Sequence, residues 1–361
     1  MDKKDCSLLP PRFTYEASED FAPQGRLWQS APSAALTEKG QIFCVYSADN
    51  RSAGEYTSNY TVCAYSDDGT NFKLAFYAWY EHEVRISETL LFMSPEGVLY
   101  HFWTQNYGYF DGRGGVWCAV CENPDAPVPR FGEPRRVCDG CMADNPVVLR
   151  DGRWLFGASV WTHISTPWHP FPEYEKASVW ESVDQARTLT YLGGAVDPKP
   201  DFTENTVFET GDGRLVMLLR TQKGIARATS SDGGKNWSEV SDFVLPSPSS
   251  RFFVSRFPSG ALLIVTHYHF EGRSHLTALL SDDDGESFLC PLLLDERREV
   301  SYPSGNIRRD GRVLLAYDRE RTGAREILLA SFTEQDMRRG SFGEGSYTKR
   351  LVSAGGKPDG V

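Results

Sequence analysis

A short turn that ends in glycine and leads into an apolar segment recurs six times along this chain. The copies read "EKGQIFCVY", "PEGVLYHFW", "RDGRWLFGA", "GDGRLVMLL", "PSGALLIVT" and "RDGRVLLAY". Their glycines follow one another at spacings of 57, 55, 61, 47 and 51 residues, at Gly40, Gly97, Gly152, Gly213, Gly260 and Gly311. Repeats of about 50 residues are typical of β-propellers with four-stranded blades. The sequence therefore predicts an all-β, six-bladed propeller that forms a single domain over residues 1–361.

A second repeat is consistent with four-stranded blades. Two copies fit the pattern S-x-D-x-G-x-x-aromatic, a third is one residue short, and a fourth lacks both the glycine and the aromatic. In that order they are "SSDGGKNW" (230–237), "SDDDGESF" (281–288), "SDDGTNF" (66–72) and "SVDQARTL" (182–189). An aspartate side chain accepts hydrogen bonds from a turn backbone, and glycine tolerates a positive φ. We therefore expect Asp68, Asp232 and Asp283 to form hairpin turns between outer strands and to have no catalytic role.

Charge and hydropathy exclude several classes of partner. The 361 residues carry a net charge of −11 and no basic run, which argues against nucleic acid. No apolar run approaches the roughly 20 residues that span a bilayer, so no membrane partner is expected. The first residues lack an apolar stretch typical of a signal peptide, so we expect a cytoplasmic protein unless a leader has been removed. A local arginine cluster can still attract an acidic small ligand.

Four of the eight cysteines have the spacing of a zinc site. Cys118, Cys121, Cys138 and Cys141 form a C-x2-C-x16-C-x2-C pattern, which fits structural zinc. However, the stretch "GGVWCAVCENP" is typical of a strand, on which Cys118 and Cys121 face opposite sides. We therefore expect ordinary buried thiols, with zinc as the alternative.

The glycine repeat also locates a candidate site. The strands before and after each turn form an antiparallel hairpin, so the start of the first strand and the end of the second lie together. Nine residues before the glycines stand Ala31, Glu88, Ala143, Glu204, Arg251 and Tyr302. Seven residues after the glycines stand Ser47, Thr104, Ser159, Arg220, His267 and Asp318. Because the blades surround one axis, we expect both sets to ring one mouth of the central channel.

The last three blades carry most of the ionisable residues of this ring. The expected pairs are Glu204 with Arg220, Arg251 with His267, and Tyr302 with Asp318, and Asp144 is expected beside them. Polar residues at strand ends are often simple solvated caps. Charged groups at this density, however, need partners when they are partly buried. We therefore predict a ligand-binding site at this mouth.

With these residues placed, the sequence resembles the sialidase (neuraminidase) superfamily of the bacterial Asp-box type, from about Trp28 to Thr333. The serine–aspartate turns resemble the Asp-boxes of that family. The resemblance implies a tyrosine nucleophile assisted by a glutamate, an aspartate as acid/base, and three arginines that hold the carboxylate of sialic acid. It implies a carbohydrate substrate and no cofactor.

The resemblance assigns these roles to residues of this chain. Tyr302 in "SYPSG" matches the nucleophile, and Glu204 in "TENTVFETGDGRLVMLLR" matches the assisting glutamate. Arg220, which closes that segment, matches the second arginine, and Arg273 in "GRSHLTALLSDDDG" matches the third. Asp318 stands where the family often has a glutamate that supports the first arginine.

Two roles of the family are not matched in register. Where the first arginine is expected, "WQSAP" has Ser30. Arg26 is near but out of register, so we expect Arg251 to supply the charge from another blade. The stretch "SADNR" resembles the A-D-x-R stretch that precedes the acid/base aspartate. Glu55, or else Asp49, is therefore expected to act as acid/base.

Further residues are expected to contact the substrate. Arg51 ends the "SADNR" stretch, and Trp28 opens the "WQSAP" stretch. The glycine-rich segment "NYGYFDGRGGVW" is typical of a loop over the mouth, where Asp111 and Arg113 would recognise a subsite. The aromatic segment "WTHISTPWHPFPEY" is expected to line a subsite for the leaving group.

These residue types suit the chemistry of an acidic sugar. The planar guanidinium group holds a carboxylate through two charge-assisted hydrogen bonds. A neutral phenol, unlike a carboxylate nucleophile, is not repelled by a carboxylate on the anomeric carbon, and sialidases accordingly use tyrosine. The first hypothesis is therefore an exo-acting, retaining hydrolase of a terminal acidic sugar.

Two alternatives stay open at this point. The first is another enzyme on the same scaffold, a uronate lyase with His267 and Tyr302 as base and acid, or a rhamnosidase-like hydrolase. The absence of the first arginine favours it. The second is a carbohydrate-binding propeller without catalysis, against which the retained Glu204, Arg220 and Arg273 argue.

Overall fold

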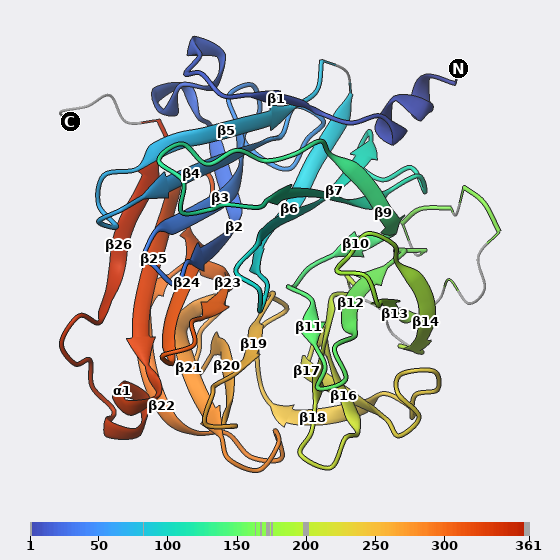
Figure 1. The fold of residues 1–361 in the computed structure, drawn as a ribbon, viewed down its shortest axis with the longest axis vertical. Coiled ribbons are helices and arrows are strands. Elements are labelled where there is room, and N and C mark those ends of the chain that lie inside the picture. Colours follow the sequence, from blue (N-terminus) through green and yellow to red (C-terminus); the bar gives the residue numbers. More distant parts are fainter. Residues whose placement is uncertain are drawn as a thin grey trace.

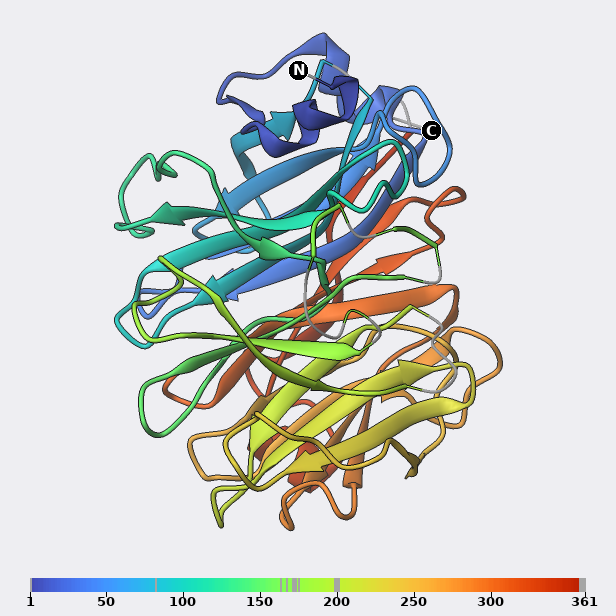
Figure 2. The same cartoon turned by 90° about the vertical axis from the view of Figure 1, so that its right-hand side faces the viewer.

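Six antiparallel sheets surround a central axis in the computed structural model (Figure 1), as the glycine repeat predicts. It describes residues 2–81, 83–162, 164–166, 168–170, 174, 176–197 and 202–356. The prediction of a six-bladed propeller is confirmed. Figure 2 shows the blades from the side, with the connecting loops at their ends.

The strands of each blade follow one another along the chain. Blade 1 contains β2 (Trp28–Leu36), β3 (Ile42–Asp49), β4 (Tyr60–Ser66) and β5 (Lys73–Trp79), with β1 (Arg12–Thr14) at its outer edge. Blade 2 contains β6 (Val84–Met93), β7 (Leu99–Tyr107), β8 (Gly115–Cys121) and β9 (Arg135–Asp139). Blade 3 contains β10 (Cys141–Met142), β11 (Val147–Val148), β12 (Trp154–Ser159), β13 (Ala177–Ser182) and β14 (Thr190–Ala195).

The second half of the ring is regular, with four strands in each blade. Blade 4 contains β15 (Asn205–Glu209), β16 (Leu215–Thr221), β17 (Gly224–Ser230) and β18 (Ser241–Leu245). Blade 5 contains β19 (Phe253–Arg256), β20 (Leu262–His267), β21 (Ser274–Ser281) and β22 (Leu289–Arg298). Blade 6 contains β23 (Val300–Ile307), β24 (Arg312–Arg319), β25 (Glu326–Thr333) and β26 (Tyr347–Ala354). The short helices are η1 (Lys3–Leu8), η2 (Glu19–Phe21), η3 (Pro23–Gly25) and α1 (Glu334–Arg339).

The two repeats of the sequence occupy the predicted turns. The six glycines lie between the first and second strands of the blades, with φ between +83° and +97°, a range that side chains rarely adopt. The Asp-boxes lie between the third and fourth strands. In one of them, Asp232 accepts hydrogen bonds from Ser230 Oγ at 2.9 Å and from the N–H groups of Lys235 and Asn236. The predicted structural role of these aspartates is thus confirmed.

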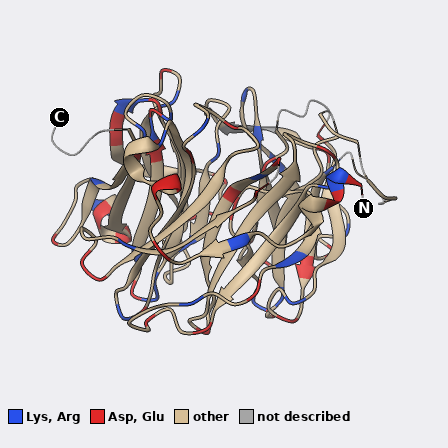
Figure 3. Cartoon of the chain, turned by 90° about the horizontal axis from the view of Figure 1, so that it is seen from above, with Lys and Arg blue, Asp and Glu red and all other residues tan. Residues whose placement is uncertain are grey.

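Apolar side chains fill the spaces between neighbouring blades. Six clusters of buried side chains each join two adjacent sheets, such as Phe43 of blade 1 with Trp103 of blade 2, and Val265 of blade 5 with Leu315 of blade 6. Charged residues of both signs are spread among the loops (Figure 3). Among the helices of the described residues, none is long and apolar enough to cross a membrane.

A buried arginine helps to close the ring between blades 1 and 6. The guanidinium of Arg26 donates to Gln29 Oε1 and Tyr46 OH, both at 2.9 Å, and to Tyr60 OH at 3.3 Å. It also donates to Ser353 Oγ of the last strand at 3.1 Å. Arg26 therefore helps to join blades 1 and 6. It does not stand at the sequence position where the resemblance expects a ligand-binding arginine.

Further polar contacts cross the same seam. Gln29 Nε2 donates to the carbonyl of Arg325 at 2.6 Å, and Ser304 Oγ donates to Ser33 Oγ at 2.9 Å. Because every strand of a blade comes from one stretch of chain, the first and last blades are joined by side chains, packing and a few main-chain bonds, such as that from the N–H of Gln29 to the carbonyl of Arg321 at 3.1 Å. The two ends of the chain therefore depend on each other for the geometry of the mouth.

We expect Arg26→Met to lower the free energy of unfolding by about 3 kcal/mol, because Gln29 and Tyr46 would lose a buried donor. Urea unfolding followed by tryptophan fluorescence measures this loss. The matched control is Arg12→Met, which removes an exposed ion pair with Glu81 and should change the stability by no more than about 0.5 kcal/mol. Equal effects of both substitutions would show that closure does not rest on Arg26.

Candidate active site

Three innermost strands share one backbone conformation at the residue nine positions before the turn glycine. Ala31, Glu88 and Tyr302, three of the residues that stand nine before a turn glycine, have φ of +50°, +53° and +56°. Each lies where the register of the innermost hairpin shifts by a β-bulge. A left-handed conformation is costly for a residue with a side chain, and a bulge re-aims that side chain. The bulge of β23 thus sets the direction of Tyr302.

The tyrosine and a glutamate from another blade share one arginine. Nη1 of Arg220, on β16, donates to Glu204 Oε2 at 2.8 Å and to the hydroxyl of Tyr302 at 3.1 Å. Nε of Arg220 donates to Ser249 Oγ at 3.0 Å. The predicted pair of Glu204 and Arg220 is present. The phenol and carboxylate oxygens lie within about 6 Å of each other, since both bond one nitrogen.

Three more arginines surround the ring of Tyr302. The guanidinium carbons of Arg321, Arg251 and Arg273 lie 4.0, 4.6 and 5.2 Å from the ring centroid. A guanidinium at these distances is attracted to the electron-rich face of the ring. The phenol therefore lies in a strongly cationic environment, in a chain whose net charge is −11.

Arg321 occupies the region where the sequence lacks the first arginine, and sequence reasoning missed it. Ser30, at the expected position, donates instead to Asp318 Oδ2 at 2.7 Å. The guanidinium of Arg321 lies 3.2 Å from Asp318 Oδ2 and donates to Ser301 Oγ at 3.1 Å. Nη1 of Arg321 lies 3.8 Å from Glu55. Asp318 thus supports an arginine, as predicted, but that arginine comes from the loop after β24.

The electrostatics of Arg321 keep it charged. Burial alone would lower the pKa of Arg321, but Asp318, Tyr302 and Glu55 outweigh burial and raise that pKa. The side chain remains 20% exposed, so its charge can reach a ligand. The only sequence signal was the arginine-rich stretch "DRERTGAR" after the last predicted strand, outside the register of the repeats.

Arg251 does not play the substrate-binding role predicted for it. It is 2% exposed and forms an ion pair with Glu88, which joins blades 5 and 2 across the channel. Burial lowers the pKa of Arg251 to about 10. In this arrangement Glu88, and not a ligand carboxylate, compensates the charge of Arg251. Arg251 instead supports the ring of Tyr302 from within the channel.

His267 is also wrong as a ligand contact and as the partner of Arg251. Its side chain is fully buried, and Nε2 donates to the carbonyl of Val300 at 2.9 Å. Burial lowers the pKa of His267 to about 4, so the ring is neutral at physiological pH. His267 therefore fixes the backbone two residues before Tyr302. The expected direct pair of Tyr302 with Asp318 is likewise replaced by Arg321, which contacts both.

Asp49 organises a loop and is not free to act as acid/base. One oxygen accepts the N–H groups of Arg51 and Ser52, at 2.7 and 3.0 Å. The other accepts from Ser58 Oγ at 2.5 Å and from Asn59 Nδ2 at 2.8 Å. The carboxylate is fully buried. Asp49 thus shapes the loop 50–59, which carries the other candidate.

Glu55 reaches the mouth from this loop. It accepts hydrogen bonds from Arg85 Nη2 and from the hydroxyl of Tyr109, both at 3.1 Å. Its side chain is 31% exposed. Burial alone would raise the pKa of Glu55, but Arg85, Arg321 and the bond from Tyr109 outweigh burial and lower that pKa. Glu55 is therefore a solvent-accessible carboxylate beside the arginines at the mouth.

The glycine-rich loop after β7 contacts the mouth through different residues than predicted. Arg113 pairs with Asp2 at 2.9 Å and Asp5 at 3.2 Å, and its N–H donates to Asp111. Burial raises the pKa of Asp111. These partners direct Arg113 and Asp111 toward the N-terminal helix η1 and away from a ligand. Tyr109, which bonds Glu55, is one residue of this loop that reaches the site.

Aromatic rings line one wall of the mouth. Phe110 contacts Trp161 with ring centroids 5.0 Å apart, and Trp161 contacts Phe202 at 5.2 Å. The guanidinium of Arg220 lies 5.2 Å from the ring of Phe202. Trp161 begins the aromatic segment predicted to line a subsite, of which 163, 167 and 171–173 lie outside the described residues.

Three other predicted contacts lie away from the exposed site. Asp144 borders a cavity of about 10 Å³ with Glu204 and Arg251, the room of about one water. Burial raises the pKa of Asp144 to about 7. Trp28 is 3% exposed, which is too little to stack on a sugar. Arg51 lines a separate cavity beside blade 1.

The cysteine geometry contradicts the zinc alternative. Cys118 packs in the core between blades 2 and 3, whereas Cys121 packs in the core between blades 1 and 2. Burial raises the pKa of Cys118 and of Cys141 to about 12, so both stay protonated, and Cys138 is equally buried. In the part of the chain that the structure describes, no group of three or more potential ligands is placed to hold a metal ion.

Comparisons with known proteins agree with this architecture. The family model described as "BNR repeat-like domain" matches residues 89–315, more than half of the chain. The comparison with curated proteins found no match.

Several solved structures share the fold. An intramolecular trans-sialidase from Ruminococcus gnavus, in complex with oseltamivir carboxylate, is 12% identical, with a TM-score of 0.63 over 90% of this chain and 98% of that one. A leech intramolecular trans-sialidase, in complex with 2,7-anhydro-Neu5Ac, is 12% identical, with a TM-score of 0.65 over 90% and 71%. A protein of unknown function from Dyadobacter fermentans DSM 18053 is 16% identical, with a TM-score of 0.63 over 87% and 95%. The resemblance to the sialidase superfamily is thus confirmed at the level of the fold.

We expect Glu88→Gln to lower the free energy of unfolding by about 3–5 kcal/mol, because it leaves the buried guanidinium of Arg251 without a counter-charge. The double substitution Glu88→Leu with Arg251→Met should recover most of that loss. Denaturant titration measures both. Glu286→Gln, which removes an exposed partner of Arg227, is the control and should cost no more than about 0.5 kcal/mol. A small loss in Glu88→Gln would contradict a buried pair.

Proposed function

We propose that this chain, which belongs to the family of BNR repeat-like domains, is an exo-acting glycoside hydrolase that removes a terminal acidic sugar of the sialic acid type and retains its configuration. The observation that carries the proposal is the shared bond of Arg220 Nη1 to Glu204 and Tyr302. The phenol and the carboxylate that bond this nitrogen are the two groups that a tyrosine nucleophile and its assisting base would require. The sialidase fold of the structural neighbours supports the same reading.

Three arginines would bind the carboxylate of the sugar. Arg220, Arg273 and Arg321 all approach Tyr302, and the last two are only partly buried. Arg273 donates to the carbonyl of Ser249 at 2.9 Å, which orients it toward the same point. A carboxylate held by guanidinium groups gains charge-assisted hydrogen bonds in fixed directions. The anomeric carbon of such a sugar would then lie next to the phenol.

Tyr302 would attack that carbon and Glu204 would take the proton. The phenolic oxygen forms a bond to the anomeric carbon while its proton passes to the carboxylate of Glu204, as the glycosidic bond breaks. A phenol is neutral before the attack, so the sugar's own carboxylate does not repel it. A water molecule then replaces Tyr302 at the anomeric carbon, and Glu204 returns the proton to the phenolic oxygen.

Glu55 would supply the proton to the leaving group. In the first step the acid form of Glu55 protonates the glycosidic oxygen, and in the second step its carboxylate takes a proton from the attacking water. Because the pKa of Glu55 is lowered, its acid form is scarce at neutral pH and becomes more abundant only as the pH falls toward that pKa. Among the candidates for acid/base, Glu55 is partly exposed and Asp49 is fully enclosed.

The position of His267 speaks against the lyase alternative. A lyase base must reach the proton it abstracts, within about 3 Å or through one water. His267 is fully buried and its Nε2 donates to Val300. A hydrolase with Tyr302 as nucleophile needs no such base.

The first test is hydrolysis of 4-methylumbelliferyl N-acetylneuraminic acid by the natural chain and by Tyr302→Phe. We expect release of the fluorophore by the natural chain, and a fall in kcat of at least about 10³-fold in the variant, because phenylalanine offers no nucleophile. Tyr317→Phe makes the same chemical change on β24, where the hydroxyl bonds Asp295, and should keep full activity. Turnover by Tyr302→Phe would contradict the proposed nucleophile.

We expect Arg321→Ala to raise KM for the same substrate by about 10- to 100-fold, the effect of losing a hydrogen bond to a charged group. Arg321→Lys should recover part of the loss because it restores the charge without the planar fork. Steady-state kinetics measure both. Arg319→Ala is the control, since Arg319 pairs with Glu326 at 3.0 Å, and it should leave KM unchanged. An unchanged KM in Arg321→Ala would show that Arg321 does not hold the carboxylate.

A further inference from the structure

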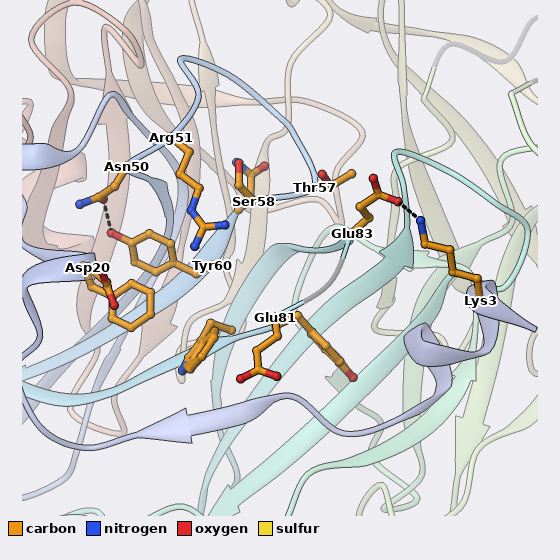
Figure 4. A pocket seen from close by; sticks show the side chains of 13 residues that line it. Lys3, Asp20, Asn50, Arg51, Thr57, Ser58, Tyr60, Glu81 and Glu83 are labelled. Carbon is orange, nitrogen blue, oxygen red and sulfur yellow. Dashed lines mark hydrogen bonds and ion pairs between the residues drawn. The ribbon is translucent and has the colours of Figure 1, made fainter. Parts of the chain in front are cut away.

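A second cavity lies beside blade 1, apart from the site around Tyr302. It has a volume of about 360 Å³, within the range of ligand pockets. It is formed by the N-terminal stretch with Lys3, Asp20 and Phe21, by the loop 50–59 with the first residue of β4, and by the last residue of β5 with residues 80, 81 and 83 (Figure 4). We call this cavity the outer pocket.

The outer pocket opens on the same end of the propeller as the candidate active site. Strand β3 ends and β4 begins at the loop 50–59, whose residue Glu55 contacts the arginines at the mouth. Thr57 and Ser58 of the same loop line the outer pocket. Two residues span at most about 7 Å, so the outer pocket begins about one sugar ring away from Glu55.

The lining of the outer pocket suits a neutral, hydroxyl-rich ligand. Phe21, Trp79 and Tyr80 offer aromatic faces, on which the C–H face of a sugar ring can pack. The charged groups nearly cancel, because Lys3 pairs with Glu83 at 3.0 Å and Glu81 is already paired outside the pocket. A net charge close to zero favours hydroxyl groups over an ionic ligand.

Arg51 is the unused donor of the outer pocket. Its side chain is exposed, and its guanidinium has no hydrogen bond or ion pair to any residue that the structure describes. Figure 4 shows this guanidinium reaching into the pocket beside Tyr60. The backbone N–H of Arg51 bonds Asp49, which fixes the main chain from which this side chain extends. Five N–H donors on such a group can bind two neighbouring hydroxyls of a sugar.

Loop and N-terminal contacts hold the walls of the outer pocket together. Arg113 pairs with Asp2 and Asp5 at the two sides of Lys3, and thereby fixes the helix η1 against the propeller. These pairs explain why Arg113 faces away from the active site. The wall next to Lys3 is thus ordered by the fold itself.

We infer that the outer pocket binds the neutral sugar to which the terminal acidic sugar is linked, with Arg51 as its specificity-determining hydrogen-bond donor. The inference rests on the proposed function, because it places this neutral sugar on the leaving-group side of the cleaved bond. It makes the protein an enzyme for oligosaccharides and not merely for the terminal residue.

The kinetic test compares a substrate that has a leaving-group sugar with one that has none. We expect Arg51→Ala to lower kcat/KM for 3′-sialyllactose about tenfold, the effect of one or two lost hydrogen bonds. The same substitution should leave kcat/KM for the 4-methylumbelliferyl glycoside unchanged. Lys39→Ala, at the opposite end of blade 1, is the control and should change neither. Equal changes on both substrates, or no change on either, would overturn the inference.

A binding measurement separates this inference from the proposed function. Lactose is titrated calorimetrically into Tyr302→Phe and into the same variant carrying Arg51→Ala. We expect lactose to bind the first and to bind the second about tenfold more weakly. If the natural chain hydrolyses neither substrate, the proposed function fails, and the titration alone decides the outer pocket. Absent binding, or binding that ignores Arg51→Ala, overturns it.

Discussion

The carboxylate of Asp318 connects the closure of the ring with the geometry of the site. It is fully buried and accepts hydrogen bonds from Ser30 Oγ and the N–H of Ala31 in the first blade. It also accepts from Ser301 Oγ at 2.6 Å in its own blade and pairs with Arg321. A buried carboxylate is tolerated only when its oxygens are bonded in this way. One group therefore joins both ends of the chain and holds an arginine at the mouth.

The cluster of arginines is stable because most of its members have their own counter-charge. Arg220 pairs with Glu204, Arg251 with Glu88, and Arg321 with Asp318 and Glu55. Arg273 differs, since its bond to the protein within the described residues is to the carbonyl of Ser249. A carbonyl only partly compensates a full positive charge. The uncompensated positive charge at the mouth thus lies mainly on Arg273. An anionic ligand would neutralise this charge, although the chain as a whole is acidic.

Strand register explains what the sequence could predict. The glycine turns set the hydrogen-bond register of each hairpin, so counting from them placed Tyr302 and brought Glu204 to Arg220. Counting could not find Arg321, because its loop leaves the register after β24 and its reach depends on tertiary contacts. Nor could it find the pair of Glu88 with Arg251, which depends on the width of the channel. The resemblance to the sialidase superfamily likewise suggested roles for residues in matching motifs. It could not say which residue replaces the first arginine, whose motif is not matched.

The β-bulge that recurs in three blades holds three different residue types in one backbone conformation. The same backbone conformation carries alanine in blade 1, glutamate in blade 2 and tyrosine in blade 6. The sequences around the first and last of these are nearly identical, "SAPS" at 30–33 and "SYPS" at 301–304. Since all three places already bear the strain of a left-handed residue, exchanging the side chain at any of them requires no new main-chain geometry. The propeller thus repeats one main-chain conformation around its axis, and the neighbours of each position decide whether an alanine, a charged side chain or a phenol stands there.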